Sequence, residues 1–381
     1  MAEDSNATEL TVDYDDEIFF LQRRGGISRY FTEMIEQFHQ EPALGIRPRW
    51  TFDRTDNEIL RTSSWGAKFA RQRPMPRPVI RLAGKWRPAH EAVRAWQVGT
   101  GPGRKGQLLH ATYWAPSRAN LEAHQRLAVS VMDLIPEHSH ARGFGGPYGG
   151  REALLKRASV VFTISDATRD DLLQLYPWIE VPVLTTPLAA DTRVFNQAGG
   201  THSSDYPYVL FVGNRGGYKN FEVLVTALAD LRARGLDIGL VAAGPPANVQ
   251  EAAAAHSQLP RDRVDFVEPT DQELAGLYRG AEAFVFPSAM EGFGLPTLEA
   301  MACGCPAVIS DISVFREVAG KAAIYAQAGS AADLAKALEE VLTSSDRRAQ
   351  LVAAGLSRAA EFTWARTAAL TAAGYRMACD E

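Results

Sequence analysis

The chain has 381 residues, which is more than one hydrophobic core usually serves, so its length favours two domains. A net charge of −5 at pH 7 argues against a protein coated for nucleic acid, and a hydrophobic fraction of 46% fits a globular protein. No apolar run is long enough to cross a bilayer, the polar first ten residues do not resemble a signal peptide, and three cysteines cannot build a disulfide framework. We therefore expect a reduced, cytoplasmic protein with no nucleic-acid partner.

Short β-rich apolar runs alternate with amphipathic helical stretches along the whole chain. In the first half we expect strands at 17–21, 47–52, 107–111, 127–132, 159–164 and 181–186. In the second half we expect them at 208–213, 238–244, 264–268, 283–288, 306–310 and 322–326. Alternation of strand and helix is typical of a parallel sheet covered on both faces, and it occurs twice, so we predict an α/β chain with two Rossmann-like domains.

Turn-forming residues between 191 and 206 separate the two halves. We predict an N-terminal domain over 1–192, with a flexible polar tail over 1–14, and a C-terminal domain over 193–362. A last helical stretch over 363–381 has no strand after it. Crossing back to the first domain is one way for this helix to bury its apolar side.

A strongly basic segment covers 61–105, with eleven Lys and Arg residues against a single acid, Glu91, for a net charge of +10. Four aromatic residues lie between these charges: Trp65, Phe69, Trp86 and Trp96. Basic and aromatic residues together suit an anionic membrane surface, so we interpret the segment as an insertion that contacts lipid or a lipid-linked diphosphate. The alternative is a solvated helical hairpin, or a loop ordered by its neighbours.

The strongest chemical signal is the run EGFGLPTLEAM at 291–301, directly after the apolar run at 283–288. Pro296 suits the first turn of a helix, and Gly304 suits the residue just past its end. Glycines before a helix let backbone N–H groups approach an anion, and a carboxylate can accept both hydroxyls of a ribose. We expect Glu291 in the loop and Glu299 one turn into the helix to reach the same cleft. The alternative is a tight loop with a capping glutamate.

On these residues the chain resembles the retaining glycosyltransferases of family 4, which have the GT-B fold. Their signature is two glutamates separated by seven residues inside EGFGLPxLEAMA and followed by G-x-P-V/A, which this chain matches through 303–310. The resemblance is strong over 208–325 and looser over the first domain. It implies two Rossmann-like domains facing a central cleft, with Glu299 on the nucleotide ribose and Glu291 beside the transferred sugar. The donor contacts that it implies around them are Gly292, Phe293, Gly294 and Leu295.

A second motif, FVGNRGGYKN at 211–220, links a strand to a helix through a glycine-rich turn. The resemblance implies that Lys219 neutralises the donor diphosphate, and we expect Arg215 as the second cation, because charge develops on the β-phosphate as it leaves. A dinucleotide-binding loop is excluded because the G-x-G-x-x-G spacing is missing. A strand–helix turn with surface charges is the alternative. Recognition of the base is expected near 266–270.

In the first domain, Gly25 and Gly26 follow the strand predicted at 17–21. The family places a glycine-rich loop here that faces the donor phosphates and the acceptor. His110 and Ser165 end two further predicted strands, where an open sheet exposes residues to its crevice, so both are candidate contacts of the acceptor or sugar. An ordinary β–α turn, and for His110 a structural role, are the alternatives.

The chain departs from the family after the strand predicted at 127–132. Many members have histidine followed by aspartate there, whereas this chain has Met132 and Asp133. We keep Asp133 as a catalytic candidate together with Glu291 and Lys219. His138 is the candidate for replacing the missing histidine.

Asp13, Asp15 and Asp16 match the spacing of a D-x-D metal motif, but they lie in the predicted tail, so we expect no metal there. The resemblance implies a retaining, metal-independent hexosyltransferase without a cofactor. Its donor would be a nucleoside-diphosphate sugar, and its acceptor an oligosaccharide or lipid-linked saccharide in surface polysaccharide assembly at the inner face of the membrane. One alternative is a nucleotide-sugar 2-epimerase, which would lack the EGFGLP helix. The other is a non-catalytic nucleotide-sugar sensor.

Overall fold

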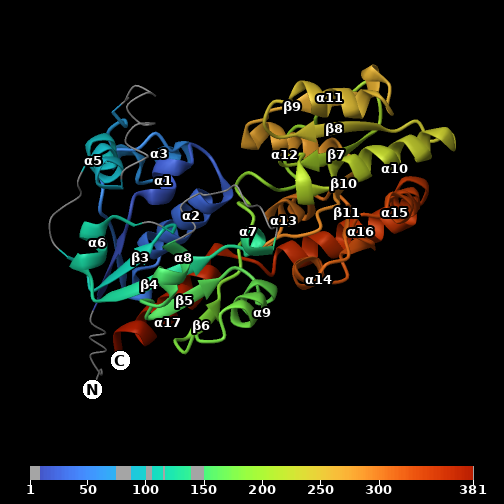
Figure 1. Cartoon of the computed structure of the whole chain (residues 1–381). Helices are drawn as coiled ribbons and strands as arrows, with labels where there is room; N and C mark the ends of the chain where they lie inside the picture. Colours follow the sequence, from blue (N-terminus) through green and yellow to red (C-terminus); the bar gives the residue numbers. More distant parts are fainter. Residues whose placement is uncertain (1–8, 74–86, 100–104, 115, 139–149, 381) are drawn as a thin grey trace. The chain divides into compact units, whose positions relative to one another are not determined.

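The computed structural model describes residues 9–73, 87–99, 105–114, 116–138 and 150–380 (Figure 1). The chain forms two compact units, which we call unit 1, Met1–Pro187 with Trp364–Glu381, and unit 2, Leu188–Thr363. The division falls between 187 and 188, a few residues before the predicted boundary at 192/193, and the last helix belongs to unit 1.

The described part of unit 1 contains a six-stranded parallel sheet with the strand order β2-β1-β3-β4-β5-β6. Its strands are β1 (Leu10–Tyr14), β2 (Ile46–Trp50), β3 (Leu108–Ala111), β4 (Arg126–Val131), β5 (Val160–Thr163) and β6 (Val183–Thr185). The α-helices around it are α1 (Glu17–Leu21), α2 (Gly26–Gln40), α3 (Glu58–Thr62), α5 (Arg87–Val98), α6 (Arg118–Ala123), α7 (Ile135–His138), α8 (Arg151–Leu155), α9 (Asp166–Leu175) and α17 (Trp364–Asp380).

The predicted strands are confirmed except for the first. The run at 17–21 forms the helix α1, and the first strand is β1, which lies inside the segment predicted as a flexible tail. A short apolar run cannot be assigned to strand or helix by periodicity alone, which explains this error. β1 pairs with β2 on one side and β3 on the other, and Val12 and Tyr14 are fully buried.

The three aspartates of the D-x-D spacing are buried and engaged by unit 1 itself. Asp13 accepts hydrogen bonds from Arg49 Nε and Nη2 at 2.7 Å each. Asp15 accepts from the backbone N–H of Thr112 at 3.0 Å, while burial raises the pKa of its carboxyl group to about 6. Asp16 forms a buried ion pair with Arg94 of α5. These carboxylates therefore hold β1 to its neighbours.

Helix α17 packs against α2 and the strands β4, β5 and β6, and Figure 1 shows it in red among the N-terminal elements. The hydroxyl oxygen of Tyr375 lies 2.6 Å from His110 Nδ1 and 2.8 Å from the hydroxyl oxygen of Tyr14. His110 Nε2 lies 2.8 Å from Ser130 Oγ, and the imidazole is fully buried. The interpretation of His110 as a substrate contact is therefore wrong, because the buried imidazole uses Nδ1 to contact the last helix and Nε2 to contact the neighbouring strand β4.

Ser165 has a comparable structural role at the end of β5. It is the N-cap of α9, and its hydroxyl oxygen accepts from the backbone N–H of Thr168 at 3.0 Å. The side chain is fully buried. The expected contact with acceptor or sugar is wrong here too, since the hydroxyl satisfies the start of a helix.

Unit 2 contains a second six-stranded parallel sheet, within the described residues, with the order β12-β11-β10-β7-β8-β9. Its strands are β7 (Tyr208–Val212), β8 (Gly239–Ala243), β9 (Val264–Val267), β10 (Ala283–Phe286), β11 (Ala307–Ser310) and β12 (Ala323–Ala326). Its α-helices are α10 (Phe221–Ala233), α11 (Val249–His256), α12 (Asp271–Gly280), α13 (Leu295–Ala302), α14 (Ser313–Ala319), α15 (Ala331–Thr343) and α16 (Ser345–Ala359).

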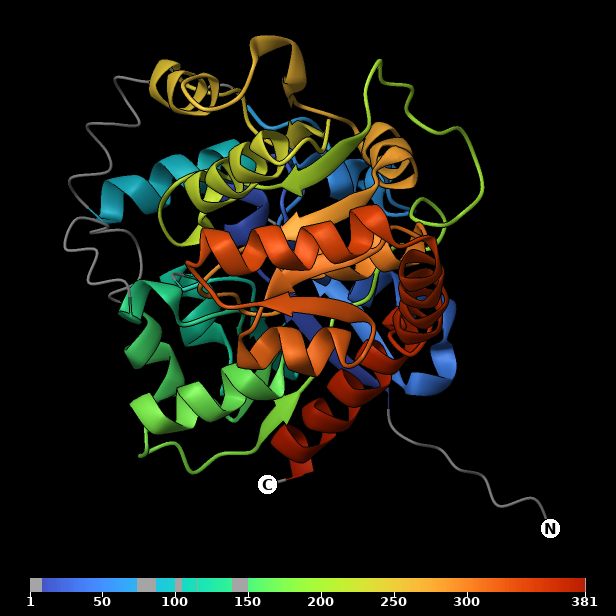
Figure 2. The ribbon, with the colours of Figure 1, turned by 90° about the vertical axis from the view of Figure 1, so that its right-hand side faces the viewer.

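The sheet of unit 2 is doubly wound. The chain moves from β7 outward to β9, returns to β10 beside β7, and continues outward to β12. Right-handed crossovers in opposite directions place α10 and α11 on one face and α12, α13 and α14 on the other. Figure 2 shows α15 beside α10 on the first of these faces, where the two helices pack together. The order reverses between β7 and β10, which is the point where open α/β sheets bind ligands.

No helix in the described parts of the chain combines the length and the apolar character needed to cross a membrane.

The buried His110 predicts a pH-dependent stability of unit 1. Burial lowers the pKa of His110 to about 3, so between pH 6.5 and 3 the unfolded chain binds a proton that the folded chain does not. Stability is therefore lost as the pH falls, by about 2 kcal/mol between pH 7 and pH 5. Urea unfolding of the wild type and His110→Gln at both pH values measures the difference.

Comparing the wild type with His110→Gln isolates the contribution of His110, because both proteins contain Asp15. The titration of Asp15 changes the stability in the opposite direction. Its raised pKa means that the folded state gains stability as the pH falls through about 6. We expect the wild type to lose more stability than His110→Gln. Equal losses in both proteins would contradict the burial of a neutral imidazole.

Candidate functional site

The candidate site of unit 2 lies where β7 and β10 end side by side. Because these strands are parallel neighbours, the loops that follow them leave the same edge of the sheet. The backbone N–H of Ala289 donates to the carbonyl oxygen of Tyr218 at 2.7 Å, and Asn220 Nδ2 donates to the carbonyl oxygen of Pro287 at 2.9 Å. Two hydrogen bonds thus tie the glycine-rich loop 213–219 to the loop 287–294.

Asn220 makes this connection from an unusual backbone conformation. Its φ of 52° lies in the left-handed region, which asparagine tolerates better than most residues. It is the N-cap of α10, but its side chain bonds to Pro287 rather than to the helix. Asn220 was not predicted from the sequence as a functional residue, although an asparagine between a glycine-rich turn and a helix is a usable signal.

Lys219 and Glu291 are the central pair of this site. Lys219 Nζ lies 2.5 Å from Glu291 Oε1, and only 13% and 11% of the two side chains are exposed. The ammonium group also lies 4.9 Å from the ring centroid of Phe286 and 5.3 Å from that of Tyr218. The structure therefore brings together two residues that are far apart in the sequence and that we had assigned to the same chemistry.

The N-terminus of α13 follows Glu291 directly. Gly294 has φ of 91°, and a Cβ atom there would lie 2.6 Å from Phe315 Cε1, so only glycine fits this turn. No side chain caps the helix, its first turn contains no acid, and Pro296 stands at its start. The N-terminal backbone of α13 is thus suited to an anion. Phe293 and Leu295 flank the turn, with Phe293 buried.

Glu299 lies one turn into α13 and is 6% exposed. The hydroxyl group of Tyr278, on α12, donates to Glu299 Oε2 at 3.3 Å. Burial, and next the charge of Glu299, hold the pKa of Tyr278 far above its usual range, so the phenol stays a donor. Tyr278 was missed from the sequence because its helical position predicts only a core residue.

Arg215 is the second cation that was expected to contact the donor. Its side chain is buried, with Nε donating to Glu251 Oε2 at 3.1 Å and Nη2 donating to the carbonyl oxygen of Pro245 at 2.5 Å. The guanidinium group lies 5.4 Å from the ring centroid of Phe266. The guanidinium group is thus largely engaged by unit 2 itself, and its expected contact with the donor stays a prediction. Arg215 holds loop 213–219 to the segment after β8, which is the other neighbour of β7.

A cavity of about 360 Å³ lies between this loop and the starts of α10 and α11. Most of the polar side chains that line it already form hydrogen bonds or ion pairs with other residues of unit 2. Asn220 donates to Pro287, Asn248 caps α11 through the N–H of Glu251, and Glu251 pairs with Arg215. The cavity is therefore part of the support of the loop.

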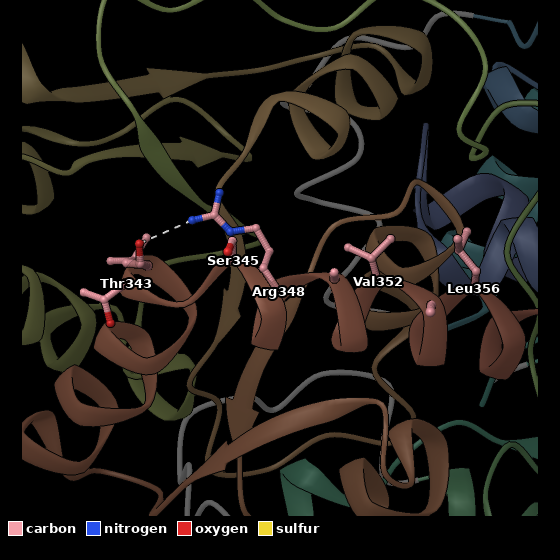
Figure 3. A pocket seen from close by; sticks show the side chains of 8 residues that line it. Thr343, Ser345, Arg348, Val352 and Leu356 are labelled. Carbon is pink, nitrogen blue, oxygen red and sulfur yellow. Dashed lines mark hydrogen bonds between the residues drawn. The ribbon is translucent and has the colours of Figure 1, made fainter.

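A second, wide groove of about 650 Å³ follows α16 and the end of α15. Figure 3 shows Thr343, Ser345, Arg348, Val352 and Leu356 along it. None of the residues that line it was predicted as a site residue. We therefore do not count this groove as part of the candidate site.

In unit 1, Gly25 is the N-cap of α2 and Gly26 is its first residue, with no side-chain cap. They come after α1, not directly after a strand as predicted. Asp133 follows β4, where its Oδ1 accepts from the N–H of Ile135 at 3.1 Å. His138 is on α7, 43% exposed, and its Nε2 lies 2.7 Å from Asp171 Oδ2.

The basic segment 61–105 is only partly a surface feature. Trp65 and Phe69 are buried in unit 1, where their rings pack against Trp50, and Arg94 forms the buried ion pair with Asp16. Trp96 is 45% exposed, with the guanidinium group of Arg73 at 5.6 Å from its ring centroid. Trp86 lies outside the described residues.

The family described as "Glycosyl transferases group 1" matches residues 194–358, which covers the β7 loop, Glu291 and Glu299. The matched segment coincides with most of unit 2, so the candidate site lies within it.

Curated relatives extend the likeness beyond this segment, to about two thirds of the chain. The chain is 28% identical over 291 residues to a D-inositol 3-phosphate glycosyltransferase of Stackebrandtia nassauensis, covering 68% of this chain and 66% of that protein. It is also 28% identical over 263 residues to the serotype-specific mannosyltransferase WbdA of Escherichia coli, covering 64% of this chain and 32% of WbdA. The alignments thus span about two thirds of the first relative and about a third of the second.

The sucrose-phosphate synthase of Thermosynechococcus elongatus has the same fold, with a TM-score of 0.72 at 20% identity over 96% of this chain and 98% of that one. Together with the two doubly wound parallel sheets, this likeness confirms the predicted GT-B class of α/β fold with two Rossmann-like domains.

Proposed function

We propose that the protein is a glycosyltransferase that transfers a hexose from a nucleoside-diphosphate sugar with retention of configuration and without a metal. The observation that carries the proposal is the Lys219–Glu291 pair at the switch point of unit 2, next to the uncapped start of α13. A cation and a helix N-terminus suit a diphosphate, and a carboxylate beside them suits the hydroxyls of a sugar.

We assign the donor to unit 2 and the acceptor to unit 1. Lys219 and the N-terminal backbone of α13 bind the diphosphate, while Glu299, oriented by Tyr278, accepts hydrogen bonds from the ribose. The base binds near 266–270, after β9. In unit 1, Gly25 and Gly26 remain candidates for contacts with the donor phosphates and the acceptor. Asp133 and His138 remain candidates for the acceptor side, with Asp133 as the catalytic candidate there.

In the proposed reaction, an acceptor hydroxyl forms a bond to the anomeric carbon on the face that the diphosphate leaves. The bond between that carbon and the β-phosphate oxygen breaks, and the hydroxyl proton passes to a β-phosphate oxygen. Negative charge grows on the diphosphate during this step. Lys219 stabilises that charge, which is the part that a metal ion has in other transferases.

The curated relatives support a saccharide or lipid-linked acceptor and a part in surface polysaccharide assembly. One carries the name of a serotype-specific mannosyltransferase and another that of an inositol-phosphate glycosyltransferase. We propose that the enzyme works in the cytoplasm at the inner face of the membrane. There the segment 61–105 meets anionic lipid through Trp96 and, among its described residues, the exposed Lys68, Arg71, Arg73 and Lys105.

A donor screen tests the reaction. We expect a thermal-shift screen of UDP, GDP, ADP, CMP and dTDP sugars to reveal one donor, because a ligand at 100 times its dissociation constant adds about 2.7 kcal/mol of stability. Transfer or slow hydrolysis of that donor should persist in EDTA. Activity that disappears in EDTA and returns with magnesium would rule out the metal-independent mechanism, and binding without any turnover would favour the sensor.

Substitutions separate the two roles in unit 2. Glu299→Ala should weaken nucleoside-diphosphate binding by about 10- to 150-fold, since it removes a hydrogen bond to a charged group. Lys219→Ala should lower kcat by about 100- to 1,000-fold, because its charge counts most as the diphosphate leaves. Calorimetry and initial rates measure these effects. Normal turnover of Lys219→Ala at saturating donor would reduce Lys219 to a binding residue.

The membrane proposal is tested by sedimentation with vesicles. We expect binding to anionic vesicles at low salt and release at high salt, because each basic residue near the surface contributes about 1 kcal/mol that salt screens. Trp96→Ala should weaken the binding, whereas the buried Trp65 is not expected to contact lipid. Equal partitioning to neutral and anionic vesicles would contradict the proposal.

A further inference from the structure

The Lys219–Glu291 pair joins the two side chains to which the proposed function gives different ligands. Lys219 is assigned to the diphosphate and Glu291 to the sugar, yet Nζ and Oε1 are 2.5 Å apart. Both side chains are mostly buried, so water screens the attraction between the two charges only weakly. The ligand-free site therefore contains a contact that competes with the donor.

A diphosphate oxygen that accepts a hydrogen bond from Lys219 must lie close to Glu291. With Nζ at 2.5 Å from Oε1, that oxygen would lie no more than about 5.5 Å from the carboxylate if the pair stayed intact. Two anionic groups repel each other at this distance, and more strongly where water is partly excluded. Glu291 therefore opposes a diphosphate as long as nothing else takes its carboxylate.

The sugar of an intact donor can supply hydrogen-bond donors to the carboxylate of Glu291. Its hydroxyl groups can donate hydrogen bonds to Glu291 while Lys219 turns to the phosphate, so each partner of the pair gains a new contact. The free nucleoside diphosphate that remains after transfer has no sugar to offer. With that product bound, Glu291 is again a carboxylate beside a diphosphate.

We infer that Lys219 and Glu291 form an exchange pair that opens for the intact donor and closes to expel the nucleoside-diphosphate product. The inference rests on the proposed function and adds that the same carboxylate which recognises the sugar lowers the affinity for the product. Glu291 is thus a specificity determinant between donor and product. Both ligands must break the contact between Lys219 and Glu291. The intact donor replaces it with hydrogen bonds from the sugar to Glu291, whereas the free product does not.

The test measures the affinity for UDP or GDP, whichever stabilises the wild type in a thermal-shift assay. Glu291→Gln keeps the shape of the side chain and removes its charge. We expect this variant to bind the nucleoside diphosphate about 3- to 10-fold more tightly than the wild type, while its turnover falls. Its affinity for the intact nucleotide sugar should rise less, or fall, because a sugar contact is weakened.

Two further variants identify the cause of the expected gain in affinity for the nucleoside diphosphate. In Lys219→Met the same Glu291→Gln change should give a smaller gain, because only the repulsion between the carboxylate and the diphosphate is removed and no lysine is released. An equal gain in both backgrounds would show that the charge of Glu291 acts alone, and it would overturn the exchange. Glu222→Gln is the matched control, since Glu222 is an exposed carboxylate in the first turn of α10, three residues after Lys219. Glu222→Gln should leave the affinity for the nucleoside diphosphate within about twofold of the wild-type value.

The outcomes separate this inference from the proposed function. If the wild type binds a nucleoside diphosphate but Glu291→Gln binds it equally or less tightly, only the exchange is wrong. If the wild type binds none of the nucleoside diphosphates, the proposed function fails and the exchange fails with it. Unfolding temperatures of all variants establish that an altered affinity does not reflect lost structure, and Glu291→Ala repeats the test if Glu291→Gln folds poorly.

Discussion

The parallel pairing of β7 with β10 is the constraint on which the candidate site depends. These strands lie far apart in the sequence, but once they are neighbours their carboxyl ends share one edge of the sheet. Two hydrogen bonds between the following loops then fix the glycine-rich turn against the segment before α13. Lys219 and Glu291 meet only because of this pairing, and the helix N-terminus suited to an anion is held beside them.

Unit 1 has a similar doubly wound sheet but uses its own switch point differently. There the order reverses between β1 and β3, and the segments after these strands are joined by the hydrogen bonds from Thr112 to Asp15. The next residue, Asp16, forms an ion pair with Arg94 of α5. The carboxylates at this edge are engaged by the protein itself, which holds the end of β1 in place. In unit 2 the charged pair remains next to an uncapped helix, so that edge is the more suitable one for an anionic ligand.

Arg215 and Lys219 show how position decides the role of a cation. They lie four residues apart on one loop, and both were expected to face the donor. Arg215 points toward the segment after β8 and forms an ion pair with Glu251, so it holds the loop to that segment. Lys219 points toward the loop after β10. A planar guanidinium group with several donors can satisfy a carboxylate and a backbone carbonyl at once, which suits burial better than a lysine ammonium group.

The sequence by itself determined the two α/β halves, nearly all of the strands and the run of glycines and glutamates around α13. Hydrophobic periodicity and turn residues are local properties, so they can be read without knowing the neighbours of a strand. The tertiary structure alone decided that His110 and Ser165 are structural, that β1 lies within the expected tail, and that Arg215 is buried while Lys219 meets Glu291. These outcomes depend on which strands become adjacent and on how far each side chain is removed from water, and neither is encoded in the residue types of a single segment.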